Sequence, residues 1–186
     1  MKSLTLFSNL IRLALLALLL PAGWLVAQNP DSPAVSQLLA SVKNHATLAD
    51  DDAATLESYT RSNLRWSTHG AQLNKMKDHV NNLIRDANRL SSMRNEASPW
   101  QQEAIDRVSA LLPEMASYLT ETINHFNDKM TRITLQPYRE MVLANQKIIH
   151  DAREIIADIV DYDKAKARAD ALEKQLQLPA AASPSS

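Results

Sequence analysis

The sequence contains no cysteine and only two glycines, Gly23 and Gly70, among its 186 residues. Without cysteine it has no disulfide, no thiol nucleophile and no attachment motif for c-type haem. Sheets and long loops use glycine at turns whereas helices avoid it, so the scarcity of glycine favours an all-helical fold. The same scarcity excludes a glycine-rich phosphate loop and the Gly-x-Ser-x-Gly turn of hydrolases. No motif therefore indicates an enzyme.

The sequence also lacks an excess of charge of either sign. It has 20 lysines and arginines and 21 aspartates and glutamates, which are interspersed and give a net charge of −1. Such a surface offers no electrostatic attraction to nucleic acid or to anionic lipid. We therefore expect no nucleic-acid partner.

The first 27 residues differ from everything that follows them. Lys2 and Arg12 precede a run of leucine and alanine over residues 13–20, and the apolar stretch ends at Ala27. This pattern predicts a secretory signal peptide over residues 1–27. The alternative is a retained membrane anchor, but the apolar run is about 15 residues long, whereas a spanning helix needs roughly 20.

Cleavage after Ala27 would produce an exported protein without stable membrane insertion. The style of the signal points to a bacterial host, and hence to the periplasm or the cell exterior. Cleavage removes two basic residues and no acidic ones, which leaves 18 basic against 21 acidic residues and a net charge of −3. We expect residues 28–178 to form a single domain, and residues 179–186, which are only Ala, Pro and Ser, to be disordered.

A seven-residue repeat organises the middle of the chain. Two interleaved series indicate one face of a long helix, expected over about residues 52–93, of the kind found in bundles and coiled coils. The first series is Tyr59, Trp66, Leu73, Val80 and Ala87, and the second is Ser62, His69, Met76, Leu83 and Leu90.

Capping signals place the other helices. Ser32 followed by Pro33 predicts the start of a short first helix, ending at about residues 44–46, and Asp50, Asp51 and Asp52 would favour the start of the next helix. The stretch Ser98-Pro99-Trp100-Gln101 predicts the start of a third helix, with Gln101 able to reach back to the cap. A last helix begins at Gln136 and Pro137 and projects, or packs on the first helix, at its far end.

The third helix carries its own seven-residue series, which includes Leu119 and Phe126. If the second and third helices form an antiparallel hairpin about the turn at residues 95–98, Trp66 faces Phe126 and Leu73 faces Leu119, and Tyr59 would face Ile133. The sequence therefore predicts an all-α, elongated antiparallel bundle of three long helices and one short N-terminal helix.

A cofactor or ligand pocket is one hypothesis for the bundle interior. His69 lies in the apolar series, Gly70 beside it would open space, and Pro113 could bend the third helix. A pocket there would be lined by Trp66, Met76 and Met115, and a non-covalent haem could use His69 and Met115 as axial ligands. The alternative is that His69 is a buried polar residue that fixes the helix register.

Metal-binding and catalytic patterns are weak. The three aspartates 50–52 lack the glycine and closing glutamate of a calcium loop. Glu121 with His125, and His150 with Glu154, are spaced by four residues instead of the three of a di-metal site. His45, His79 and the paired carboxylates, Asp161 with Asp163 and Glu103 with Asp106, are expected on solvated helix faces. We expect no metal site, no cofactor and no catalytic residue.

The sequence therefore predicts an exported, non-enzymatic bundle that acts through protein–protein interaction or self-association along apolar helix faces. The alternative is a bundle that binds or senses a small molecule, with haem as one candidate. Its pocket would lie near His69, Gly70 and Pro113.

Overall fold

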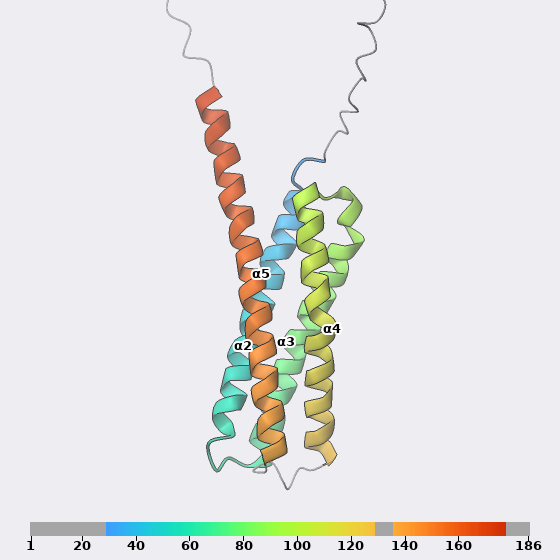
Figure 1. The fold of residues 1–186 in the computed structure, drawn as a ribbon, viewed down its shortest axis with the longest axis vertical. Helices are drawn as coiled ribbons and strands as arrows, with labels where there is room; N and C mark the ends of the chain where they lie inside the picture. The colour runs from blue at the N-terminus through green and yellow to red at the C-terminus, as the bar shows by residue number, and fades with distance from the viewer. Residues whose placement is uncertain (1–28, 129–135, 178–186) are drawn as a thin grey trace, which may run out of the picture.

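The computed structural model describes residues 29–128 and 136–177, which form four helices and no strand (Figure 1). These are α2 (Pro33–Tyr59), α3 (Trp66–Ser92), α4 (Pro99–Asp128) and α5 (Gln136–Gln177), with the short 3-10 helix η1 (Arg94–Glu96) between α3 and α4. The helix α2 packs on α3 and α5, and α4 packs on the same two helices. The predicted all-α bundle is confirmed.

Each helix buries one face at alternating intervals of four and three residues, which is the pattern that a seven-residue repeat predicts. In α3 the buried face includes His69, Leu73, Met76, Val80 and Leu83. In α5 the same pattern begins at Tyr138 and Val142 and ends at Asp163. The core is therefore a column of side chains along the bundle axis.

The predicted break near residues 47–51 was wrong. The first helix continues to Tyr59 and has 27 residues, as many as α3, so it is not short. Its buried face runs through Ala46, Ala49 and Ala53, whose small side chains hid the repeat, and Asp52 is buried at 3% exposure instead of capping a new helix.

The chain instead turns between Tyr59 and Trp66, where backbone bonds from the amides of Thr60, Arg61 and Ser62 close a turn. The seven-residue step from Tyr59 to Trp66 thus crosses from one helix to the next. The predicted long helix over residues 52–93 is two antiparallel helices.

The predicted α3–α4 hairpin is confirmed. The rings of Trp66 and Phe126 lie 6.5 Å apart, and Leu73 and Leu119 are both buried. At the turn, Oε1 of Gln101 accepts a hydrogen bond from the amide of Ser98 at 3.2 Å, as the capping pattern predicted. The predicted partner of Tyr59, Ile133, lies outside the described residues.

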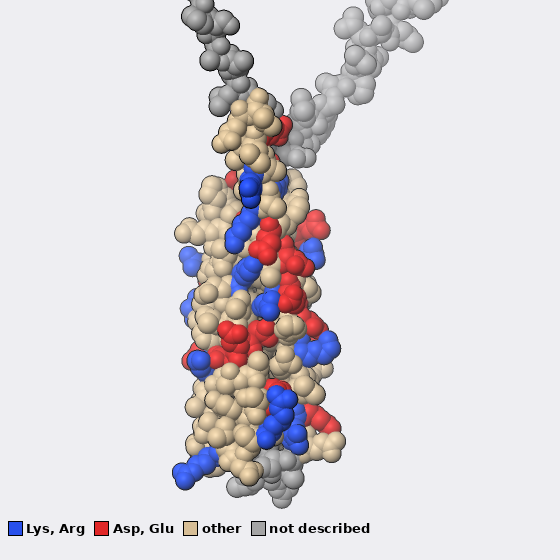
Figure 2. Space-filling view, turned by 90° about the vertical axis from the view of Figure 1, so that its left-hand side faces the viewer, with Lys and Arg blue, Asp and Glu red and all other residues tan. Residues whose placement is uncertain are grey.

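The last helix is the longest, and its C-terminal part projects past the ends of the other helices (Figure 1). On the side of the molecule shown in Figure 2, acidic and basic side chains are interspersed, in keeping with the near-zero net charge. None of the described helices is both long and apolar enough to cross a membrane. The predicted signal peptide, residues 1–27, and the predicted tail, residues 179–186, lie outside the described residues.

Candidate protein-binding surface

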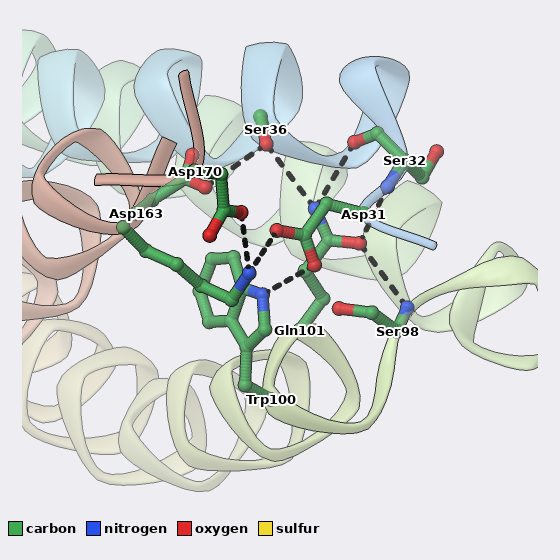
Figure 3. Close-up of polar contacts among 9 residues, drawn as sticks. Asp31, Ser32, Ser36, Ser98, Trp100, Gln101, Asp163 and Asp170 are labelled. Atoms are coloured by element: carbon green, nitrogen blue, oxygen red, sulfur yellow. Dashed lines mark hydrogen bonds and ion pairs between the residues drawn. The ribbon is translucent and has the colours of Figure 1, made fainter. Parts of the chain in front are cut away.

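A network of polar side chains joins three helices (Figure 3), at the end of the bundle from which α5 projects (Figure 1). We call it the end network. It links residues before and in the first turn of α2, residues at the start of α4, and one face of α5. Its members are Asp31, Ser32, Ser36, Ser98, Trp100, Gln101, Asp163, Lys166 and Asp170.

Gln101 is the centre of this network and is fully buried, with 0% exposure. Its Oε1 accepts hydrogen bonds from the amides of Ser32, at 2.8 Å, and Ser98, at 3.2 Å. Its Nε2 donates to the carbonyl of Ser32 at 3.0 Å and to Oγ of Ser36 at 3.1 Å. One side chain therefore satisfies amides that precede both α2 and α4, and fixes the two helix starts against each other.

The second half of the network attaches α5. Nε1 of Trp100 donates to Oδ1 of Asp31 at 2.6 Å, and Nζ of Lys166 contacts Oδ2 of Asp31 at 2.8 Å and Asp170 at 2.9 Å. Burial raises the pKa of Asp31, but the hydrogen bonds from Lys166 and Trp100 outweigh it, so this pKa lies below its ordinary value. The hydrogen bonds to Asp31 and Asp170 raise the pKa of Lys166, so Asp31 and Lys166 both stay charged near neutral pH.

From Tyr162, just before this attachment, to Leu176, beyond it, α5 exposes an apolar face. Tyr162 is 55% exposed, Leu172 50% and Leu176 86%, and Ala165 and Ala169 between them are exposed as well. These five residues, which we call the α5 stripe, follow one another at intervals of three, four, three and four, and therefore share one side of the helix. The sequence left open whether this end of the helix projects or packs on the first helix, and the structure leaves these five residues exposed.

A cleft between α4 and α5 continues the stripe into the bundle. It has a volume of about 290 Å³ and is lined by Trp100, Glu103, Ala104, Arg107, Asp158, Ile159 and Tyr162. At its end the rings of Trp100 and Tyr162 meet at 5.4 Å in an edge-to-face contact. The sequence placed Trp100 at the start of the third helix, and the structure adds that its ring supports α5.

His69 lies in the core, as its position in the repeat predicted, with 1% exposure. Its Nδ1 is 3.2 Å from the hydroxyl of Tyr138 on α5, and its ring meets the ring of Tyr59 at 5.8 Å. Burial lowers the pKa of His69 and raises that of Tyr138. A neutral imidazole hydrogen-bonded to a phenol is the arrangement of a buried polar contact between helices.

The proposed pocket near His69 is filled by side chains. A Cβ added to Gly70 would lie 3.0 Å from Cζ of Phe126, so this glycine makes room for a ring and not for a ligand. Met76 and Met115 have 0% exposure, and Pro113 is exposed on the outer side of α4. This packing disfavours the small-molecule hypothesis, and with it a haem.

The carboxylates considered for catalysis make structural contacts. The hydrogen bond from Lys43 to Asp161 lowers the pKa of that carboxyl group, and Arg94 does the same to Asp106. Asp163, which the sequence placed on an exposed face, is buried and accepts a bond from Oγ of Ser36 at 3.2 Å. Its burial follows from its place at the end of the buried face of α5.

His45 and His79, which the sequence placed on solvated helix faces, are instead partly buried and pair with aspartates. Between α2 and α3, Nε2 of His45 lies 3.6 Å from Asp86, and Nε2 of His79 lies 3.5 Å from Asp52. The spacing of His45 to Asp52 equals that of His79 to Asp86, so antiparallel packing pairs them crosswise. Recognising this repeat required knowing that α2 and α3 are separate helices.

The two pairs considered for a di-metal site, Glu121 with His125 and His150 with Glu154, do not form one. Glu121 accepts a bond from Ser117 on its own helix, and His150 contacts Asp50 at 3.1 Å. In the part of the chain that the structure describes, no three histidine, aspartate or glutamate side chains come together in a way that could hold a metal ion.

Comparison with protein families, with curated proteins and with solved structures finds no match for this chain. The end network, the cleft and the α5 stripe are the features of the described residues that indicate a function.

The buried His69 predicts a dependence of stability on pH. Its pKa in the folded protein is below the ordinary value of 6.5, so below about pH 6.5 the unfolded chain binds more protons. Stability from this residue is therefore lost as the pH falls, by at most about 1.4 kcal/mol per pH unit. In urea denaturation, the stability advantage of the wild type over His69→Gln should shrink from pH 8 to pH 5. A difference that stays constant with pH would contradict this account.

Proposed function

We propose that this chain is an exported, non-enzymatic helical-bundle protein that acts by binding another protein, or a second copy of itself, along the α5 stripe. The observation that carries the proposal is the exposure of Leu172, 50%, and Leu176, 86%, on one side of a helix that projects past its bundle. Apolar side chains aligned at helical spacing are the usual anchors of helix-to-helix recognition.

The end network supports this role because it holds the base of the projecting helix. Lys166 is tied to Asp31, and Trp100 packs on Tyr162, so α5 leaves the bundle at a fixed place. A surface that is already in its binding conformation loses less entropy on association. The α5 stripe is thus presented on a supported arm.

Export is supported by the sequence of residues 1–27 alone. Cleavage after Ala27 would leave the end network complete, because the first residue of the network is Asp31. An exported chain without cysteine depends on its packed core, and the four buried helix faces supply one.

The test compares two serine variants of tagged protein isolated from the exported fraction of its own host. Leu172→Ser with Leu176→Ser should reduce the amount of bound partner at least tenfold, because burying each leucine contributes about 1.5–3 kcal/mol. Native mass spectrometry measures the bound fraction.

Leu143→Ser is the matched control, because Leu143 is 55% exposed on the same helix but lies within the bundle. It should leave the bound fraction unchanged. Equal partner binding by the wild type and the doubly substituted protein would contradict the proposal.

A further inference from the structure

The α5 stripe has the spacing of a two-helix seam. The buried face of α5 ends at Asp163 and is continued by Lys166, which contacts Asp31, and by Asp170, which contacts Lys166. The stripe lies beside this polar continuation and keeps the intervals of three and four residues. Such intervals are what one helix presents to another along a coiled-coil contact.

We infer that the partner is a second copy of this chain, whose α5 stripe pairs with the first in antiparallel orientation. This inference rests on the proposed function and names its partner. In the pairing, Ala165 lies opposite Leu176 of the second copy, and Ala169 lies opposite Leu172 of the second copy. The two bundles then stand at opposite ends of a short joint, and each copy contributes the same residues.

The sizes of the side chains select this pairing. Every layer of the antiparallel joint contains one alanine and one leucine, so the distance between the two helices stays uniform along the joint. A parallel pair in register would set alanine against alanine at residues 165 and 169, and leucine against leucine at residues 172 and 176. Two narrow layers followed by two wide ones would pack poorly.

The charges beside the stripe select the register. In the register described, Lys166, which also keeps its contacts with Asp31 and Asp170, flanks the seam opposite Glu173 of the second copy, and this placement of opposite charges occurs twice. If one helix slides by seven residues in one direction, Lys166 faces Lys166 of the second copy and Arg168 faces Arg168. If it slides by seven residues in the other direction, Glu173 faces Glu173. Like charges at these flanking positions oppose pairing.

The position of Trp100 selects the orientation. Charge alone also permits a parallel pair, in which Arg168 would flank Glu173. Trp100 at the start of α4 packs on Tyr162, so α4 lies on the same side of α5 as the first residue of the stripe. A parallel partner would place its own α4 at the same level, so the two α4 helices would compete for the same space. An antiparallel partner places only the tip of its α5 there.

The joint is small. Its four layers extend over residues 165–176, which span about 16 Å of helix at 1.5 Å per residue. A contact of this length buries less surface than a standard stable interface. We therefore expect a dissociation constant that is roughly micromolar or weaker. The test must therefore trap the dimer.

Cysteine cross-linking suits this protein because the wild type contains no cysteine. Two full-length single variants of different mass, Ala165→Cys and Leu176→Cys, are mixed and oxidised, and the products are separated without reductant. The antiparallel pairing predicts that the mixed disulfide predominates at least fivefold over either homodimer. In a parallel pair these two residues would be about 16 Å apart, beyond the roughly 7 Å between Cα atoms that a disulfide spans.

The matched control uses Ala167→Cys and Lys174→Cys, which have the same register relation but lie on the opposite side of the helix, where both residues are exposed. They should give no mixed disulfide above random collision. Homodimers of Ala165→Cys as the main product, or cross-linking no greater than in the control, would overturn the inference. The proposed function fails separately, if the serine variants of Leu172 and Leu176 keep the partner found in the host.

Discussion

Replacing Ala49 with proline is expected to lower the free energy of unfolding by about 3 kcal/mol or more. Ala49 is fully buried in the interior of α2, where proline removes a helical hydrogen bond and its ring clashes with the preceding turn. The result tests whether α2 is continuous through the three aspartates. A chain that broke near residues 47–51 would accept proline there at little cost. Urea denaturation followed by circular dichroism measures the difference.

Arg65→Pro is the control for this substitution. Arg65 is exposed before the first turn of α3, and its φ of −69° is already the value that proline adopts. We expect a change below about 1 kcal/mol, because no interior helical hydrogen bond is lost. Equal effects at residues 49 and 65 would show that the chain break has been misplaced.

Gln101→Leu is expected to destabilise the protein by about 2–4 kcal/mol. The substitution keeps a similar volume but removes four hydrogen bonds, and it leaves the amides of Ser32 and Ser98 without their side-chain acceptor. Unpaired buried polar groups cost about 1–3 kcal/mol each. Thermal and urea unfolding measure the loss, and hydrogen exchange at the starts of α2 and α4 localises it.

The neighbouring residue provides the control. Gln102 is only partly buried, and its side chain bonds to the carbonyl of Ala97 and to Arg94 within the α3–α4 connection. Gln102→Ala should cost less than about 1 kcal/mol. If Gln101→Leu were no more harmful than Gln102→Ala, the end network would not hold the two helix starts together.

Much of the fold could be predicted because helix starts have local chemical signals. Ser32 with Pro33, and Ser98 with Pro99, marked the starts of α2 and α4, and the structure begins both helices at the proline. The seven-residue repeats gave the facing of Trp66 and Phe126. These signals depend on residues close together in the chain.

The end of α2 could not be predicted in the same way. Its middle buries Ala46, Ala49 and Ala53, but alanine also occurs on exposed helix faces, as at Ala165 and Ala169, so it leaves no distinct pattern. The three aspartates favoured a helix start by their charge, but the packing of two long helices outweighs that local preference. Tertiary contacts decided where the chain turns.

The binding surface was only partly predictable. The apolar residues of the α5 stripe are visible in the sequence, but their exposure depends on where the other three helices end. The end network joins Asp31 to Lys166, which are 135 residues apart, and Ser32 to Gln101, which are 69 apart. No local pattern reveals such contacts.

The most direct test of the central claim is the native mass of wild-type protein isolated from the exported fraction of its own host. Our account predicts a chain that begins at Gln28 and is present as a dimer or bound to another protein, with no visible absorbance. A monomer at every concentration would contradict the claim that the α5 stripe binds a partner. A monomer that carries a small molecule or a haem band would favour the ligand-binding hypothesis instead.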